Sequence, residues 1–533
     1  MTAPLRCSLL LLLLTVTLHA ENARRFDLVV YGGTAGGVIT AVTAAREGLN
    51  VALLEPTNHL GGMLTGGLSW TDYGKKEVIG GYSLEFFKRV GKKYGAEIEW
   101  HFEPRIAEEV FNEMLKEASV AVFLKHRLNE KGGVRKRGAE LTAITMENGA
   151  TFEGKVFVDS TYEGDLMAQS GVEWTYGREG TSQYNESLAG VREHTPKHQF
   201  TVRVSPYDTN KKLLPEIQGG RKGEPGEADK KVQAYNFRMI LTDVKANQVP
   251  FPKPPNYSAA RYELLARMLK AMDEEFAKHG RKWLLQDVIK PDRIRGGKFD
   301  VNNNGAFSTD YIGCSWRYPL AGYAERSKIR QAHRDYVAGF FYFLAHDPQV
   351  PKDLQVQAQE LGLAEDEFRD NQHWPYQLYV RESRRMVGMY VVTQKDIQTE
   401  LTKPDVIGMG SYNSDSHNVQ RVPTQDGAVE NEGDMQVPVT PYQIPYRIML
   451  PKKAQATNLL VPVCFSASHV AYSTLRMEPQ YMIIGQAAGV AAKMAIEKGT
   501  AVQDVDTVGL TIRLRAQRAV MEWTPDRSKV VAR

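Results

Sequence analysis

The sequence predicts an α/β fold built around a Rossmann-like domain that binds a dinucleotide. An apolar strand over 28–31 leads into the glycine-rich turn G-G-T-A-G-G at 32–37, and a helix follows over 38–46. A second apolar strand over 51–54 ends at an acid, Glu55. This order is typical of a βαβ unit whose helix N-terminus binds a pyrophosphate.

The three fingerprint positions of this turn hold Gly32, Thr34 and Gly37, so a threonine replaces the second glycine. The threonine side chain narrows the approach to the phosphates, but its hydroxyl offers a bond to a phosphate oxygen. Glu55 is placed to accept hydrogen bonds from the adenosine ribose. An ordinary buried βαβ unit with a tight turn is the alternative. The dinucleotide contacts predicted for this unit are Gly32, Gly33, Thr34, Ala35, Gly36, Gly37, Glu55 and Pro56.

Length and composition indicate a globular protein of more than one domain. The chain has 533 residues, of which 42% are hydrophobic and 24% charged. Such a chain is long enough for two domains and too apolar for disorder. Its formal charge of +4 is small for this length, which argues against nucleic acid as a partner.

The N-terminus has the features of a signal peptide over residues 1–20. Arg6 precedes an apolar run over 9–18, and Leu-His-Ala at 18–20 suits cleavage. The run is too short to span a bilayer, so we expect an exported protein, periplasmic or extracellular, without a stable membrane span. Cleavage leaves Cys314 and Cys464, too few for a cysteine-ligated iron–sulfur cluster. One bridge between them stays open, although two unpaired thiols are expected.

Beyond the first unit, α/β patterning continues to about residue 180. Helices are expected at 83–94 and 106–117, strands at 121–124 and 155–158, and a hairpin around 141–152. The segment D-S-T-Y-E-G-D at 159–165 follows the last of these strands.

The composition then shifts toward proline, asparagine, tyrosine and charge, with long helices expected at 258–279 and 321–346. Past 440 a strand at 458–463 and a helix at 480–498 restore the α/β pattern. The small residues of that helix suit close packing on a sheet. We therefore predict a discontinuous nucleotide-binding domain with an inserted α+β substrate lobe. The predicted parts are 25–185 and 441–505 for the nucleotide-binding domain, 186–440 for the insert and 506–533 for a C-terminal tail.

Six separated motifs occur in order along most of the mature chain. They are G-G-T-A-G-G at 32–37, E-P-T-N-H-L-G-G-M-L-T-G-G-L at 55–68, V-D-S-T-Y-E-G-D-L-M-A at 158–168, N-N-N-G-A-F-S-T-D-Y-I-G at 302–313, S-Y-N-S-D-S-H at 411–417 and N-L-L-V-P-V-C-F-S-A-S-H-V-A-Y-S-T-L-R-M-E-P at 458–479. Together they resemble the flavin-dependent oxidoreductases of the glutathione-reductase type. The closest likeness is a bacterial FAD-dependent group often labelled xanthan-lyase-like, in which a Gly-Gly-Thr turn is usual.

This resemblance implies FAD as the cofactor. It also implies three further FAD-contacting segments: a second glycine loop, the segment after the strand at 155–158, and the start of the C-terminal helix. The residues that it adds are Gly61, Gly62, Met63, Asp159, Gly164, Asp165, Met477 and Glu478. The chain has no CxxxxC pair and no second GxGxxG motif, which disfavours disulfide or pyridine-nucleotide reductase chemistry. An NAD-dependent dehydrogenase and a flavin-bearing binding or electron-carrier protein remain alternatives.

The predicted chemistry is hydride transfer at flavin N5 with a small organic or carbohydrate-like substrate. We expect His469 to transfer the proton, and Arg476 and Arg447 to anchor the substrate, with a purely structural role as the alternative for each. Asp415 and His417 belong to the insert. His59, near the second glycine loop, is a candidate for a covalent link to the flavin.

No metal site is predicted. Residues 300–305, D-V-N-N-N-G, imitate the start of a calcium loop, but its twelfth position is Tyr311 instead of glutamate. We expect an asparagine-rich turn there. The substrate, the electron acceptor and the oligomeric state are left open by the sequence.

Overall fold

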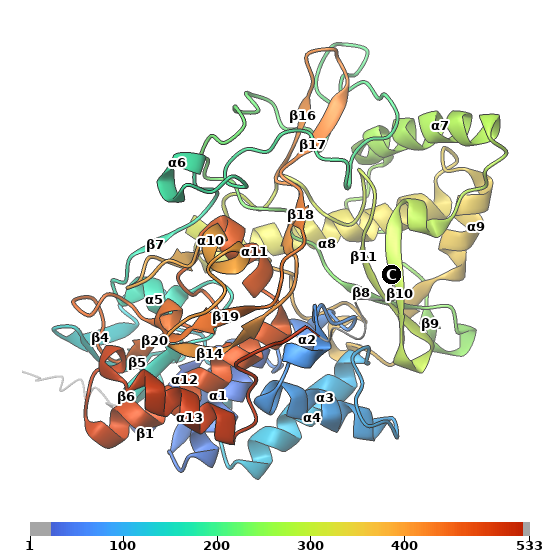
Figure 1. Ribbon diagram of the computed structural model, residues 1–533. Helices are drawn as coiled ribbons and strands as arrows, with labels where there is room; N and C mark the ends of the chain where they lie inside the picture. The colour runs from blue at the N-terminus through green and yellow to red at the C-terminus, as the bar shows by residue number, and fades with distance from the viewer. Residues whose placement is uncertain (1–22, 526–533) are drawn as a thin grey trace, which may run out of the picture.

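The computed structural model describes residues 23–525, so the predicted signal peptide lies outside the described residues. One layer is a seven-stranded sheet in the order β3-β2-β1-β6-β5-β4, with β20 paired to β6 (Figure 1). Strands β3, β2, β1, β6 and β20 run parallel, whereas β4 and β5 form an antiparallel extension. The bounds are β1 Arg24–Tyr31, β2 Val51–Glu55, β3 Ala121–Leu124, β4 Val134–Arg137, β5 Glu140–Thr145, β6 Thr151–Asp159 and β20 Leu459–Leu460.

The discontinuous architecture is visible in the pairing of β20 with β6. Leu459 lies opposite Phe157 and Leu460 opposite Val158, about 300 residues apart along the chain. The C-terminal stretch therefore returns to the sheet that the N-terminal stretch begins. The boundaries given above for the individual parts stay a prediction.

Helices α1 (Ala35–Arg46) and α12 (Glu478–Lys498) pack tightly against each other. A Cβ atom added at Gly485 would lie 2.3 Å from the carbonyl oxygen of Gly36, and one at Gly489 would lie 2.7 Å from Thr43 Cβ. The expectation that the small residues of α12 pack on a sheet is wrong, because Gly485 and Gly489 face helix α1. A small side chain lets two helix backbones approach closely whatever the partner is, so the sequence shows the small face but not what covers it.

Apart from α7, α8 and α9, which are described below, the remaining helices are short or lie on the surface. They are α2 Met63–Gly66, α3 Gly81–Lys93, α4 Pro104–Glu117, α5 Asp165–Gln169, α6 Thr181–Tyr184, α10 Gln394–Gln398, α11 His469–Leu475 and α13 Thr507–Ala516. Two-stranded pairs connect them: β7 (Trp174–Thr175) with β13 (Arg385–Met386), β14 (Val406–Gly410) with β19 (Tyr442–Pro445), β15 (Ser414–Ser416) with β18 (Met435–Val437), and β16 (Gln420–Pro423) with β17 (Val429–Glu432).

The inserted lobe has its own sheet, in the order β10-β11-β8-β12-β9, together with three helices. In Figure 1 this sheet lies at the right of the view with α7 and α9, apart from β1 and β6 at the lower left. Its elements are β8 Met239–Thr242, β9 Gln248–Val249, β10 Ile289–Ile294, β11 Lys298–Asn303, β12 Gly362–Ala364, α7 Glu263–Lys278, α8 Tyr323–His346 and α9 Lys352–Glu360.

The calcium-like segment forms most of β11 instead of the expected turn. The Asp300 carboxylate is fully buried, pairs with Arg238 at 2.8 and 2.9 Å, and accepts the backbone N–H groups of Ser69 and Trp70 at 2.8 Å. Four donors from the protein thus satisfy this carboxylate, which explains why the segment is ordered as a strand.

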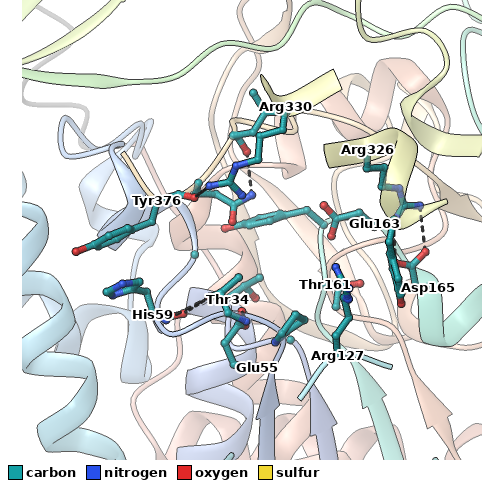
Figure 2. Close-up of a pocket in the computed structure, with 18 of the residues that line it drawn as sticks. Thr34, Glu55, His59, Arg127, Thr161, Glu163, Asp165, Arg326, Arg330 and Tyr376 are labelled. Atoms are coloured by element: carbon teal, nitrogen blue, oxygen red, sulfur yellow. Dashed lines mark hydrogen bonds and ion pairs between the residues drawn. The ribbon is translucent and has the colours of Figure 1, made fainter. Parts of the chain in front are cut away.

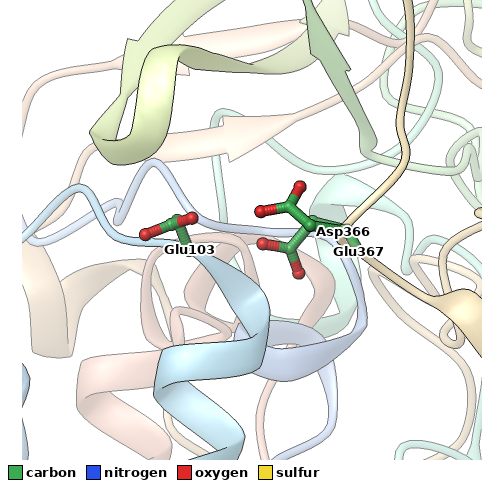
Figure 3. A group of neighbouring side chains, drawn as sticks. All are labelled: Glu103, Asp366 and Glu367. Atoms are coloured by element: carbon green, nitrogen blue, oxygen red, sulfur yellow. The ribbon is translucent and has the colours of Figure 1, made fainter. Parts of the chain in front are cut away.

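The Lys298 cluster joins the insert to helix α4. The ammonium group of Lys298 lies 2.7 Å from carboxylate oxygens of Glu103, Asp366 and Glu367. These three acids, shown in Figure 3, are close enough together to suggest a metal site. The buried ammonium already supplies the positive charge among them, so the cluster is an ion-pair junction between the two halves.

No helix among residues 23–525 combines the length and the apolar character that a membrane span requires. The two cysteines that remain after the predicted cleavage, Cys314 and Cys464, are both free, as expected.

Candidate functional site

A pocket opens where β1 and β2 end and helix α1 begins (Figure 2). Gly32, Thr34 and Glu55 line it on the side of the nucleotide-binding domain. The insert closes it from the other side, with Arg326 and Arg330 of α8 and with Tyr376. The carboxyl ends of parallel strands next to a helix N-terminus are the usual place of a dinucleotide in such sheets.

The glycine turn has the geometry that a pyrophosphate requires. Gly32 has a φ of +99°, and Thr34 is the N-cap of α1. Thr34 Oγ1 accepts the N–H of Gly37 at 3.2 Å and donates to the carbonyl oxygen of Ser160 at 2.8 Å. Because this hydroxyl already bonds within the protein, backbone N–H groups and the helix dipole are the favoured phosphate donors. The first turn of α1 contains no acid that would oppose an anion.

Glu55 reaches the pocket at the end of β2, where the sequence predicts the ribose-binding acid. Its two carboxylate oxygens accept the N–H groups of Gly33 and Thr57, each at 2.8 Å. Burial raises the pKa of Glu55, and these two hydrogen bonds oppose that rise. The side chain is therefore fixed in place and keeps lone pairs for ribose hydroxyls.

Tyr162 joins the three segments that the resemblance implicates. Its hydroxyl accepts the N–H of Met63 at 2.9 Å and donates to Glu478 Oε1 at 2.7 Å. Burial raises the pKa of Glu478 to about 8, and its second oxygen has no partner. Tyr162 lines the pocket but was not singled out from the sequence, where its only signal is its place in D-S-T-Y-E-G-D.

The two predicted aspartates of that segment have different surroundings. Asp159 does not line the pocket and accepts three hydrogen bonds, two from Thr161 and one from the N–H of Met167, while burial raises its pKa to about 6. Asp165 lines the pocket and pairs with Arg326 at 2.7 Å and Arg384 at 2.6 Å. Asp159 thus shapes the turn, and Asp165 ties the turn to α8.

The other predicted cofactor residues surround these contacts. Pro56 and Gly62 line the pocket, and the rest form the backbone beneath it: Gly33, Ala35, Gly36, Gly37, Gly61, Met63, Gly164 and Met477. Gly61 bridges to Thr34 in parallel fashion, so the second glycine loop runs beside the first.

Both ring nitrogens of His59 are already engaged at the edge of the pocket. Nδ1 lies 3.0 Å from Glu108 and Nε2 lies 3.0 Å from Asp370, while the ring stacks on Tyr376 at 3.4 Å. Burial lowers the pKa of His59, but the two carboxylates outweigh it and raise the pKa overall. A covalent link to flavin would require one of these contacts to break.

The three predicted catalytic residues do not come together in one place. His469 Nδ1 lies 2.7 Å from Glu382 and its backbone N–H donates to Glu179 at 2.8 Å. Burial lowers the pKa of this histidine to about 3. Arg447 lies beside Asp405 at 3.4 Å and over the ring of Tyr390 at 4.2 Å, and it does not line the pocket.

Arg476 is the predicted catalytic residue that belongs to a second polar site. Its guanidinium donates to the hydroxyl of Tyr379 at 3.0 Å and to the carbonyl oxygen of Asp415 at 2.8 Å. Tyr379 directly follows Leu378, which lines the pocket, and Arg476 directly precedes Met477 and Glu478. The second site therefore adjoins the pocket.

We call this site the His417 cluster: Asp310, Arg381, Asp415, His417 and Arg476. Asp310 accepts from Arg381 at 2.9 Å and lies 2.7 Å from His417 Nδ1. The sequence drew attention to Asp415 and His417 only as members of the insert and to Asp310 only as part of the motif at 302–313, and it gave no sign of Arg381. Their partners lie more than 60 residues away along the chain, so no local pattern could reveal them.

The residues of the pocket fit FAD. The helix N-terminus, the glycine turn and Glu55 suit the adenosine diphosphate half. Beside the lining residues Thr161 and Tyr162, the buried Ser160 Oγ and Glu478 Oε2 have no hydrogen-bond partner among residues 23–525 and can bond a ligand.

Comparison with protein families agrees with this fit. The family model described as FAD dependent oxidoreductase matches residues 27–516. This chain belongs to the FAD dependent oxidoreductase family. The protein is therefore an enzyme whose cofactor is FAD, and the NAD alternative is set aside. No curated protein sequence matches the chain significantly.

Solved structures are similar to this FAD dependent oxidoreductase over about a third of its length. They include L-proline dehydrogenase from P.horikoshii, with 14% identity over 30% of this chain and 59% of that chain and a TM-score of 0.24. L-amino acid deaminase from Proteus vulgaris has 14% identity over 30% of this chain and 53% of that one, with a TM-score of 0.23. OxyS anhydrotetracycline hydroxylase from Streptomyces rimosus has 13% identity over 33% and 41%, with a TM-score of 0.22. This chain thus matches about half the length of these structures, too little to transfer a substrate or reaction.

Proposed function

We propose that this oxidoreductase transfers a hydride between flavin N5 and a carbon atom of a small organic or carbohydrate-like substrate. FAD supplies the two-electron chemistry when it is bound. The observation that supports the proposal is the His417 cluster, a buried group of acids, bases and hydrogen-bonding side chains. Arg476 of this cluster bonds to Tyr379, which directly follows the pocket residue Leu378. Hydride transfer needs such a group, because a proton leaves or joins the substrate in the same reaction.

Both halves of the chain contribute residues to the FAD pocket. The turn at 32–37 and the N-terminus of α1 bind the pyrophosphate, and Glu55 holds the ribose. Arg326 and Arg330 of α8 close the pocket from the insert.

Anaerobic reduction of the purified enzyme tests this function. Its flavin band at about 450 nm should bleach when a suitable small substrate is added without oxygen. A panel of sugars, polyols, hydroxy acids and amino acids covers the proposed class. If none of them bleaches the flavin, a flavin-bearing binding or electron-carrier protein becomes the better explanation.

Two further proposals concern the cofactor and the export of the chain. If His59 links FAD covalently, acid precipitation leaves a yellow pellet, whereas a colourless pellet excludes the link. If residues 1–20 are a signal peptide, the mature chain starts near residue 21 and is found outside the cytoplasm. The leader has no twin arginine, because Arg6 stands alone before the apolar run, so either FAD would load after export or the prediction of a leader is wrong. N-terminal sequencing of the fractionated protein decides this point.

The motifs also support membership in the xanthan-lyase-like bacterial group, although a polysaccharide lyase has no need of a dinucleotide fold. The predicted role of His469 in proton transfer stays a prediction. A His469→Ala variant that keeps its FAD and loses turnover would support that role.

A further inference from the structure

The His417 cluster leaves polar atoms without partners although the side chains are buried. Asn236 and Asn418 are at most 4% exposed, and the Oδ1 atom of each lacks a hydrogen-bond partner. The same holds for Nε of Arg381, which is 1% exposed, and for Oδ1 of Asp415. Buried polar atoms are nearly always paired, so several orphans in one place indicate a ligand.

The residues that carry these atoms are connected to the cluster. Asn236 pairs with Tyr379 in an isolated bridge, and Tyr379 bonds to Arg476. Asn418 directly follows His417. The side chain of Asp415 is 19% exposed, more than the other side chains of the cluster.

We propose that the His417 cluster is the substrate subsite for a neutral polyhydroxyl compound, a sugar or polyol, and that His417 accepts the proton of the hydroxyl group that is oxidised. The proposal rests on the hydride-transfer function given above and assigns its substrate class and proton-transfer group.

Complementary hydrogen bonding favours a neutral polyol. Three of the unpartnered atoms, on Asn236, Asn418 and Asp415, are acceptor oxygens, whereas Nε of Arg381 is a donor. Hydroxyl groups serve both kinds of atom, but a carboxylate only accepts. Two arginines and two aspartates balance the formal charge of the cluster, so it has no excess of positive charge for an anion.

The geometry of His417 suits a base. Its Nδ1 lies 2.7 Å from Asp310, and the pKa of Asp310 is about 2 because Arg381 and His417 outweigh burial. Burial lowers the pKa of His417, so the ring is neutral with its proton on Nδ1. Nε2 then carries the lone pair. It lies 3.8 Å from Asp415 Oδ1, beyond hydrogen-bond reach, and is open to a substrate hydroxyl.

The reaction then balances as an alcohol oxidation. The C–H bond breaks and its hydrogen leaves with both electrons for FAD, the oxidant that the family supplies. The O–H bond breaks and its proton passes to His417 Nε2, while a C=O bond forms. Asp310 stabilises the charged imidazole and acts as a positioning residue.

The surroundings of His469 differ from those of His417. It too lies against a carboxylate, Glu382, but the oxygens of Glu382 are shared with Arg385 and Gln233. No atom of Glu179, Glu382 or Arg385 lacks a partner in the described part of the chain. The network on the Nδ1 side of His469 is therefore complete without a ligand, whereas no hydrogen bond engages His469 Nε2 among residues 23–525.

The test uses the FAD-loaded enzyme with D-glucose, D-xylose and myo-inositol as neutral probes and D-glucuronate and L-proline as charged ones. Dissociation constants come from the shift that a bound probe causes in the flavin spectrum. Limiting rates come from anaerobic flavin reduction at saturating probe. At least one neutral probe should bind more tightly than either charged probe.

Two variants separate binding from proton transfer. Asp415→Ala should weaken the binding of the neutral probe about tenfold and change the limiting rate little. His417→Asn should lower the limiting rate about a hundredfold with almost unchanged binding. His333→Asn is the matched control, because His333 is fully buried but bonds to the carbonyl oxygen of Ile329 in its own helix. It should change neither quantity. If His417→Asn fails to hold FAD, His417→Gln replaces it.

The outcomes distinguish this inference from the function on which it rests. If amino acids or hydroxy acids reduce the flavin but no neutral probe binds, hydride transfer stands and the polyol subsite is wrong. If neutral probes bind, Asp415→Ala weakens them and nothing reduces the flavin, the subsite stands and hydride transfer falls. Unchanged rates in His417→Asn, with a large loss in His469→Asn, assign proton transfer to His469 and overturn our assignment.

Discussion

Two buried clusters of charged side chains, the Lys298 cluster and the His417 cluster, have similar residue types but differ in how fully they are paired. In the Lys298 cluster one ammonium group contacts three carboxylates at 2.7 Å, and Arg105 adds a contact to Glu103 at 2.8 Å. None of its charged atoms lacks a partner within residues 23–525. In the same part of the chain, Asp415 Oδ1, Arg381 Nε and the Oδ1 atoms of Asn236 and Asn418 lack a hydrogen-bond partner, although Asp415 Oδ1 lies 3.8 Å from His417 and 3.9 Å from Arg476.

This difference separates structural charge from functional charge. Burying a charge is costly unless partners replace water, so a fully paired cluster needs nothing more and holds two parts of the fold together. A cluster with unpaired atoms is stable only because the surrounding fold holds it, and it gains when a ligand fills it. The burial of the groups is similar in both clusters, so completeness of pairing is the more informative property.

The largest expected effect comes from breaking the paired cluster. Lys298→Met leaves Glu103, Asp366 and Glu367 close together without their ammonium partner. We expect the free energy of unfolding to fall by about 3–5 kcal/mol. Urea denaturation of the purified protein measures it.

The matched control is Lys453→Met, which removes a lysine whose ion pair with Asp504 is about half exposed. It should change the free energy of unfolding by less than about 1 kcal/mol. Equal effects of the two substitutions would show that the Lys298 cluster does not hold the halves together.

The sequence predicts the nucleotide-binding unit of this molecule better than the His417 cluster. The βαβ unit, the glycine turn and Glu55 depend on local patterns, namely strand and helix periodicity and the residues of a tight turn. The structure reproduces their elements within a few residues, with β1 at Arg24–Tyr31 and α1 at Ala35–Arg46.

The His417 cluster depends on contacts that no local pattern encodes. Asp310 and His417 are 107 residues apart, and β15, which directly precedes His417, packs against α11. Tyr162 is a similar case, because its bond to Glu478 spans 316 residues. A tyrosine beside a glycine is ordinary in sequence, and its role appears only once Met63 and Glu478 are in place.

Glu478 also has an oxygen without a hydrogen-bond partner among residues 23–525, and its ionisation makes the free energy of unfolding depend on pH. Burial raises its pKa to about 8 from an ordinary 4.5. Between these two pH values the folded FAD-free protein keeps a proton that the unfolded chain releases. Its contribution to stability is therefore fully present below 4.5 and is lost as the pH rises toward 8, by up to about 1.4 kcal/mol per pH unit.

Urea denaturation of the FAD-free protein at pH 5.5, 6.5, 7.5 and 9, roughly spanning this window, measures that loss. In the Glu478→Gln variant the side chain cannot ionise. The free energy of unfolding of this variant should therefore fall less with rising pH than that of the unmodified protein. The difference between the two proteins cancels the other titrating groups. Parallel pH dependence in both would show that Glu478 is not the source.

The smallest expected effect compares two fully buried serines that differ only in pairing. Ser468 Oγ donates to Glu186 at 2.6 Å and accepts the N–H of Ala471 at 3.1 Å as the N-cap of α11. In the described part of the chain, Ser414 Oγ, next to Asp415, has no hydrogen-bond partner.

Ser468→Ala should lower the free energy of unfolding by about 1–2 kcal/mol, because a cap is lost and a buried carboxylate loses a donor. Ser414→Ala removes a hydroxyl that gains nothing from burial, so it should leave the stability unchanged or raise it slightly, by about 0.5 kcal/mol. Both substitutions delete one oxygen at a site that is 0% exposed, so burial alone predicts equal effects. A loss at Ser414 as large as that at Ser468 would mean that its hydroxyl has a partner in solution, and the contrast between paired and unpaired clusters would disappear at this position.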